Sequence, residues 1–210
     1  MRKTIIKDKI YRYTKLASAI DILRTNELTL LSPINWSDRN DIHYVEEFRR
    51  RMGYKSVHAL CFTVASETAH HWAMFAGGQD GVRIQFDPAI LSRDIERNPA
   101  LQLTGMTYMT IKTAEQKSIA PSRLPFVKRW PYRAEKEVRI LHASEAALKG
   151  PIRIPISPEA IVAIKLSPEL PEPLKATMRQ TVKNAIGNRK VSVVKSSLLE
   201  NERWLNAISD

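Results

Sequence analysis

Apolar and polar positions along this chain recur with two periods, and the periods predict which segments are strands and which are helices. Short apolar or alternating runs predict strands at 8–13, 28–31, 59–63, 82–86, 105–111, 135–141, 161–166 and 191–194. Apolar residues three and four positions apart predict helices that begin near Leu16 and that cover 43–52, 70–75, 88–96 and 171–186. Thr14 is a plausible cap for the first helix.

The order of these elements predicts an α+β fold. We expect a single mixed α/β domain over 1–210, because many short strands are joined by irregular connections rather than by regular helices. The strand, helix and strand within 159–195 suggest a right-handed crossover between parallel strands. The last residues, with Leu199, Trp204 and Leu205, are expected to dock on the core.

The most informative polar pattern lies in the segment 130–141. Alternate side chains of a strand share a face, so the apolar residues of this segment should point into a core, and Glu135, Glu137 and Arg139 should share the other face. Two carboxylates this close repel one another unless something offsets their charge. The pattern fits general-base chemistry or cation binding, and it equally fits an edge-strand salt bridge of little energetic weight.

Composition adds a basic surface to this picture. The chain of 210 residues is 43% hydrophobic, which suits one domain with a substantial core. The net charge of +11, from 33 Lys and Arg against 22 Asp and Glu, favours a polyanionic partner such as RNA or DNA. A basic surface without a specific partner is the alternative. The clustered basic residues expected to contact nucleic acid are Arg49, Arg50, Arg51, Lys128 and Arg129.

Cysteine content and hydropathy favour a cytoplasmic protein. The single cysteine, Cys61, excludes an intramolecular disulfide and a cysteine-rich zinc site, which fits a reducing compartment. Residues 1–8 lack the apolar core of a signal peptide. No stretch approaches about 18 apolar residues, so we expect no membrane span.

Other kinds of active site find weaker support. One group of neighbouring side chains is compatible with the metal site of a nuclease, and it consists of Asp38, Asp41, His43 and Glu46. Asp and Asn in such a loop more often accept hydrogen bonds from backbone amides. Cys61 lies in an apolar strand, where an inert buried thiol is the usual outcome. The sequence contains no P-loop and no Gly-x-Ser-x-Gly motif.

What remains is a set of polar and aromatic residues at the ends of predicted strands and in the short helix. An arginine can bind a pair of phosphates through its forked N–H groups. An aromatic ring can stack on nicotinamide or adenine, and a carboxylate can bind a ribose hydroxyl or stabilise a developing oxocarbenium ion. Together the residues suit a nucleotide-type ligand, and they are Arg12, Tyr13, Thr63, Trp72, Glu135 and Glu137.

An ordered series of motifs, with core motifs in 9–142, resembles the bacterial domain-of-unknown-function family 2971. The motifs are Tyr11-Arg12-Tyr13, Ser32-Pro33 with the loop 35–41, Cys61-Phe62-Thr63, His71-Trp72, the strand 81–86, and 130–139 with its Glu-x-Glu. The resemblance implies a split, largely antiparallel sheet similar to the ADP-ribosyltransferase fold. It also implies a toxin, abortive-infection or phage-defence character.

The resemblance implies a role for each residue of this set, with NAD as the cofactor and no metal. Arg12 would hold the pyrophosphate, and Tyr13 and Trp72 would shape the nicotinamide pocket. Thr63 would bind ribose or position the catalytic carboxylate. Glu137 would stabilise the transition state, and Glu135 would orient or deprotonate an acceptor in nucleic acid or protein.

Two other functions stay open at this point, so whether the chain is an enzyme is itself uncertain. One is a non-catalytic nucleic-acid-binding or sensor module, for which the Glu-x-Glu pair would be dispensable. The other is a metal-dependent nuclease, which chelation would inactivate.

Overall fold

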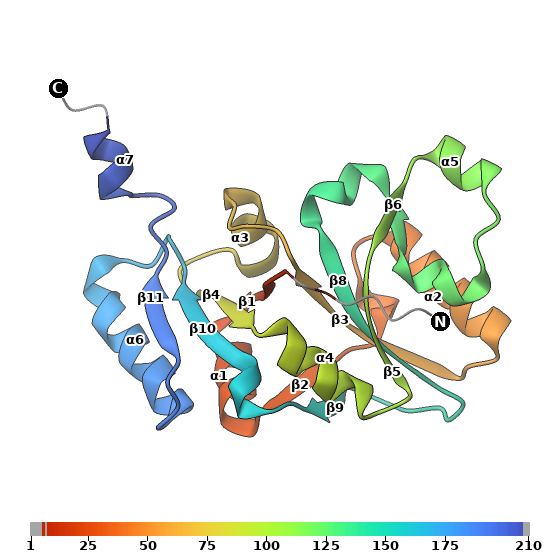
Figure 1. Ribbon diagram of the computed structural model, residues 1–210, viewed down its shortest axis with the longest axis horizontal. Helices are drawn as coiled ribbons and strands as arrows, with labels where there is room; N and C mark the ends of the chain where they lie inside the picture. The colour runs from red at the N-terminus through yellow and green to blue at the C-terminus, as the bar shows by residue number, and fades with distance from the viewer. Residues whose placement is uncertain (1–5, 7, 208–210) are drawn as a thin grey trace.

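The main sheet has seven strands, and all but one of its strand pairs are antiparallel. The computed structural model describes residues 6 and 8–207. The strands are β1 (Ile10–Lys15), β3 (Ser56–Thr63), β4 (Gly81–Phe86), β5 (Leu101–Gly105), β8 (Glu137–Ser144), β10 (Ile161–Leu166) and β11 (Ser192–Lys195). Their order is β11-β10-β4-β1-β3-β8-β5, with only β10 and β11 parallel (Figure 1). The mixed α/β class with a largely antiparallel sheet is therefore confirmed.

Two small sheets flank the main one. Strand β2 (Glu27–Leu30) pairs with β9 (Ile152–Pro155) in antiparallel orientation. Strand β6 (Thr107–Met109) pairs with β7 (Val127–Arg129) in parallel orientation. Between β6 and β7 lie α5 (Ile111–Gln116) and the 3-10 helix η2 (Pro121–Phe126).

Helices cover both faces of the main sheet. Helices α1 (Leu16–Thr25), α4 (Pro88–Glu96) and α6 (Glu172–Ile186) pack on the face that carries the largest apolar cluster. Helix α2 (Arg39–Met52) packs on the opposite face against β3 and β8, and α3 (Ala69–Ala76) packs there against β1. The short helix α7 (Glu202–Asn206) ends the described chain.

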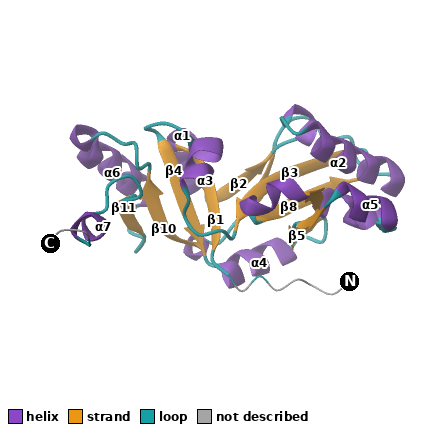
Figure 2. Cartoon of the chain, turned by 90° about the horizontal axis from the view of Figure 1, so that it is seen from above, coloured by secondary structure: helices purple, strands orange, loops and turns teal. Residues whose placement is uncertain are grey.

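The seven-stranded sheet opens between β1 and β3. These strands pair at one position, Tyr11 opposite Thr63. By contrast, β1 pairs with β4 at six positions and β3 pairs with β8 at eight. Figure 2 shows the consequence, with β11, β10, β4 and β1 in one half and β3, β8 and β5 in the other. On the face between α2 and α3, the divergence leaves room for a pocket.

Most predicted elements are present, and three predictions fail. Thr14 is part of β1, and α1 begins after Lys15 without a side-chain cap. The strand predicted at 105–111 is wrong in its bounds, because β5 ends at Gly105, β6 covers Thr107–Met109 and α5 begins at Ile111. The C-terminal residues do not dock, since the side chains of Leu199 and Trp204 are 64% and 74% exposed, and α7 projects beyond the sheet edge (Figure 1).

Two sequence expectations concern targeting. The absence of a signal peptide core was argued from residues 1–8, of which 1–5 and 7 lie outside the described residues. In residues 6 and 8–207, no helix combines the length and the hydrophobicity needed to cross a bilayer.

Candidate active site

A pocket of about 380 Å³ lies where β1 and β3 diverge. This volume is in the range of small-molecule sites, about 300–1,000 Å³. Five of the six residues singled out in the sequence line it, and they are Arg12, Tyr13, Thr63, Glu135 and Glu137. The lining also includes Cys61, Met74, Phe75 and the loop before α2. The fold therefore brings together side chains from β1, β3, the end of α3 and the start of β8.

A fully buried guanidinium forms the floor of this site. Arg139 of β8 is 0% exposed and binds both carboxylate oxygens of Asp41 in α2, at 2.9 and 2.7 Å. It also donates to Glu137 Oε1 at 2.8 Å and to the carbonyl of Pro125 at 2.8 Å. Its guanidinium carbon lies 4.6 Å from the centre of the Trp36 ring. Apart from Glu137, these partners lie outside β8, so Arg139 holds α2, η2 and Trp36 against β8.

Lys128 of β7 is a second, partly exposed cation that binds the same group of carboxylates. Its Nζ donates to Glu135 Oε2 at 2.6 Å and to Glu137 Oε2 at 3.1 Å, and it lies 4.0 Å from Asp41 Oδ2. Lys128 and Arg139 therefore offset the repulsion between the paired carboxylates. With all five groups ionised, three carboxylates against two cations leave one net negative charge.

The two glutamates differ in acidity. Burial acts to raise the pKa of Glu137, but the charges of Arg139 and Lys128 outweigh it, so this pKa is lowered. Burial raises the pKa of Glu135, and the hydrogen bond from Lys128 limits the rise. Glu137 is thus the more firmly ionised carboxylate, and Glu135 is the one that gains a proton more readily.

Glu135 lies beside Glu137 and Lys128, but in an element other than the strand that alternation predicted. It ends the 3-10 helix η3 (Trp130–Glu135), and Lys136 follows in the left-handed conformation with φ 43°. Strand β8 begins only at Glu137. The expectation that Glu135 and Glu137 share one strand face is therefore wrong, and their carboxylates meet because both bind Lys128.

Arg12 lies in the gap between the two halves of the sheet. Alternation along β1 places Ile10 in the main core and Tyr13 on the pocket face. The side chain of Arg12 therefore leaves the strand on the same face as Ile10. Its Nη1 donates to the carbonyl of Cys61 in β3 at 2.9 Å, while its Nε is buried and has no hydrogen-bond partner within residues 6 and 8–207. Burial lowers the pKa of Arg12. A guanidinium with an unused buried donor is suited to a bound anion.

Thr63 and His71 hold the backbone of Glu135. The Thr63 hydroxyl donates to the Glu135 carbonyl at 2.6 Å and accepts from the amide of Ala65 at 2.9 Å. His71 Nε2 lies 3.2 Å from the same carbonyl, and its Nδ1 lies 2.6 Å from the hydroxyl of Thr68. Burial lowers the pKa of His71, which favours the neutral ring. Thr63 therefore positions Glu135 through its backbone.

Trp72 lies beneath the pocket rather than in its wall. Its side chain is 2% exposed and meets the Tyr13 ring edge-on, with 5.1 Å between the ring centres. Its Nε1 donates to Glu67 Oε1 at 3.0 Å. Trp72 supports Tyr13, which lines the pocket.

The basic residues expected on the surface fall into two groups. Arg49, Arg50 and Arg51 pair with Glu46 and Glu47 one turn earlier in α2, which offsets part of their charge. Arg129 is exposed, whereas the Lys128 side chain is only 11% exposed and is used inside the site. The prediction of Lys128 as a free surface cation is therefore wrong, because β7 turns it inward.

The residues proposed for a nuclease metal site do not converge. Asp41 is held by Arg139, Asp38 caps α2 by accepting from the amide of Asn40, and Glu46 binds Arg49. Within residues 6 and 8–207, no group of three or more His, Cys, Asp or Glu has a geometry that could hold a metal ion.

Sequence reasoning missed three residues of this site. Asp41 had been considered as a metal ligand or as an acceptor of hydrogen bonds within its loop, and not as a partner of Arg139. Tyr108, whose hydroxyl accepts from the Glu137 amide at 2.8 Å, carried no local signal. Burial raises the pKa of Tyr108 to about 12. His71 had been named only as part of the motif His71-Trp72, with no role of its own. The sequence did indicate that two adjacent carboxylates need nearby cations to offset their repulsion, without naming those cations.

The fold and pocket define a mixed α/β protein with a charged site at the opening of a split sheet. Comparison with solved structures finds three forms of DarT from Thermus sp. 2.9, in complex with NAD+, carba-NAD+ and ADP-ribosylated ssDNA. Each is 12% identical to this chain, with TM-scores of 0.43, 0.43 and 0.45. They cover 92%, 90% and 93% of this chain, and 98%, 95% and 98% of their own. Similarity at this level assigns no activity to this chain.

No family model and no curated protein matches this sequence. The resemblance to family 2971 therefore stays a prediction, as does the finer likeness to the ADP-ribosyltransferase fold.

Proposed function

We propose that this protein is an NAD-dependent ADP-ribosyltransferase that modifies nucleic acid. One observation carries the proposal: Arg12 of β1 and Glu137 of β8, which are far apart in the sequence, line one pocket of nucleotide-binding size. A guanidinium and an ionised carboxylate in the same pocket match the two ends of a substrate with a pyrophosphate and a cationic ring.

Arg12 binds the pyrophosphate in this proposal. Its Nε is buried without a hydrogen-bond partner in the described part of the chain, and a phosphate oxygen would satisfy this donor. A charge-assisted hydrogen bond is strong where water is excluded. Tyr13 and Phe75 supply the nearby aromatic surface of the pocket.

Glu137 acts on the ribose next to nicotinamide. It accepts a hydrogen bond from a ribose hydroxyl, and the net negative charge of its cluster stabilises the positive charge that develops at C1′ as nicotinamide leaves. Glu135 orients the acceptor, with its backbone held by Thr63. NAD+ is a substrate here, and these steps assign no role to a metal.

The insertion between β5 and β8 favours a nucleic acid as acceptor. Residues 107–136 hold seven Lys and Arg against two Glu. Trp130 is 47% exposed, and the guanidinium carbon of Arg133 lies 4.8 Å from its ring centre. Exposed aromatic rings among cations bind single-stranded nucleic acid by stacking and charge attraction.

The test is transfer of label from radioactive NAD+ to single-stranded DNA, double-stranded DNA or RNA. Glu137→Gln should lower transfer by about 100-fold or more while the protein stays folded. Asp94→Asn is the matched control, because Asp94 is a buried carboxylate on α4 that binds Ser157, on the opposite face of the sheet. It should change stability and leave transfer intact.

Two other outcomes would refute the proposal. Binding of nucleic acid that weakens steeply with salt, with no NAD+ cleavage and no effect of Glu137→Gln, would indicate a non-catalytic binding module. Cleavage of nucleic acid that EDTA stops would indicate a nuclease.

A further inference from the structure

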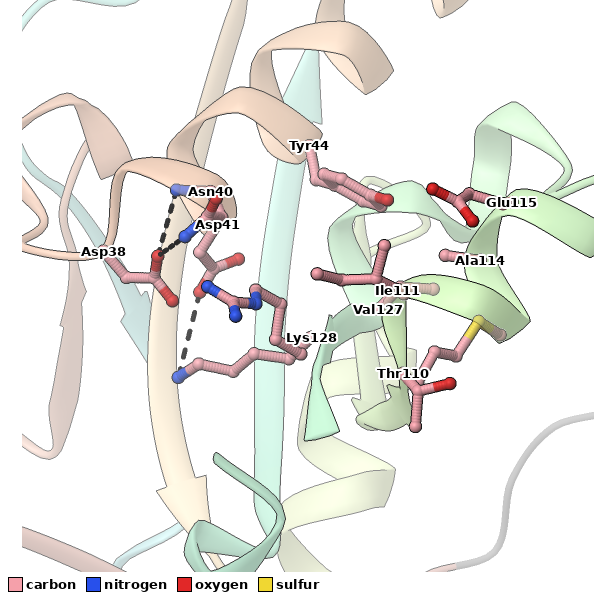
Figure 3. Close-up of a pocket in the computed structure, with 12 residues that line it drawn as sticks. Asp38, Asn40, Asp41, Tyr44, Thr110, Ile111, Ala114, Glu115, Val127 and Lys128 are labelled. Atoms are coloured by element: carbon pink, nitrogen blue, oxygen red, sulfur yellow. Dashed lines mark hydrogen bonds and ion pairs between the residues drawn. The ribbon is translucent and has the colours of Figure 1, made fainter. Parts of the chain in front are cut away.

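A second pocket adjoins the proposed NAD+ pocket (Figure 3). It has a volume of about 410 Å³ and lies between the start of α2 and the segment from β6 to β7. Tyr44, Ile111 and Val127 supply apolar surface, and Asn40, Thr110 and Glu115 supply polar groups. Asp38, Asp41 and Lys128 line both pockets. A molecule in the second pocket would therefore lie beside one bound in the first.

Among the residues that the structure describes, Asp38 is the one shared residue whose charge is not paired with another. Both oxygens of Asp41 bind Arg139, and Lys128 binds two glutamates. Within the part of the chain that the structure describes, Asp38 forms no ion pair. Its Oδ1 accepts from the backbone and side-chain nitrogens of Asn40, both at 3.0 Å. Its Oδ2 is buried with no hydrogen-bond partner among the described residues.

We propose that the second pocket holds the acceptor base and that Asp38 takes its proton. This inference rests on the proposed ADP-ribosyl transfer. Tyr44 offers an aromatic ring on which a base can stack. The terminal torsion of an aspartate is soft, so a small rotation brings Oδ2 to the pocket surface. Glu135 is the weaker candidate for this step because Lys128 holds its carboxylate at 2.6 Å.

The transfer step replaces one bond at C1′ of the ribose with another. A nitrogen or oxygen of the acceptor forms a bond to C1′ of the ribose, and the bond from C1′ to the nicotinamide nitrogen breaks. The electron pair of the broken bond stays on nicotinamide, which leaves neutral. The proton of the acceptor N–H or O–H passes to Asp38 Oδ2 and is later released to water.

Asp38→Asn isolates this role because Asn caps a helix as well as Asp does. Transfer to single-stranded DNA should fall by about 100-fold, a much larger factor than any fall in the hydrolysis of NAD+ to ADP-ribose without DNA. Asp87→Asn is the matched control, since Asp87 caps α4 by accepting from the amides of Ala89 and Ile90 and lines neither pocket. It should leave both rates unchanged.

A second variant tests the pocket independently of Asp38. Tyr44→Ala should raise the KM for DNA and leave the KM for NAD+ unchanged; equal effects on both, or none, would overturn the assignment of this pocket. Normal transfer by Asp38→Asn, or equal loss of transfer and hydrolysis, would overturn the role of Asp38 while the proposed function stands. A wild-type protein that cleaves no NAD+ would overturn both.

Discussion

Replacing Arg139 with methionine should destabilise the fold far more than a surface substitution does. Arg139 is 0% exposed and binds two buried carboxylates, those of Asp41 and Glu137. Methionine fills a similar volume but leaves both carboxylates without this partner. Removal of one member of a buried ion pair costs about 3–5 kcal/mol. With a urea m-value of about 2 kcal/mol/M, the unfolding midpoint should fall by about 2 M.

The loss should also depend on pH. In the folded protein the pKa of Glu137 is lowered, so this carboxylate binds fewer protons folded than unfolded. Its contribution to stability is present above the unfolded pKa and is lost as the pH falls through the folded pKa. Without Arg139 the folded pKa rises, and protonation at low pH relieves the unpaired charge. The cost of Arg139→Met should therefore be larger at pH 7 than at about pH 4.

Urea unfolding followed by circular dichroism, at both pH values, measures this cost. Asp94→Asn serves again as a buried polar substitution outside the cluster. A cost below about 1 kcal/mol, the usual range for exposed pairs, would refute the reasoning. So would a cost that is equal at the two pH values.

Two further predictions concern the pocket. Lys128→Met should move the acid limb of the transfer pH profile to higher pH, because Lys128 lowers the pKa of both Glu135 and Glu137. An unchanged acid limb would contradict an ionised pair in the reaction. Trp72→Phe should lower the melting temperature, because it removes the hydrogen bond to Glu67, while leaving the KM for NAD+ unchanged. A raised KM at unchanged stability would instead place Trp72 in direct contact with NAD+.

Local periodicity predicted much of the fold. The ranges expected for α4 and β10 match the structure, and α6 and β4 differ by one residue at an end. Alternation along β8 also placed Val138 and Ile140 in the core, with Glu137 and Arg139 on the other face. These features depend on burial of neighbouring residues along one element, which the sequence records directly.

The candidate site was predicted less completely. Lys128 beside Arg129 looked like a surface cation, and only the pairing of β6 with β7 turns its ammonium toward the two glutamates. The loop that carries Asp38 and Asp41 suggested either a metal site or hydrogen bonds within the loop. The structure shows a hydrogen bond within the loop for Asp38. Asp41 instead binds Arg139 in β8, a partner that no local pattern predicts.

The sequence by itself determined most of the strands and helices and the basic character of the chain. Tertiary structure decided which charges meet. Arg12 illustrates the difference, because alternation along β1 assigns it to the core side of the sheet. It reaches the pocket only because β1 and β3 separate after a single paired position. Such a separation arises from long-range packing of the two halves of the sheet, and residue order along one strand carries no record of it.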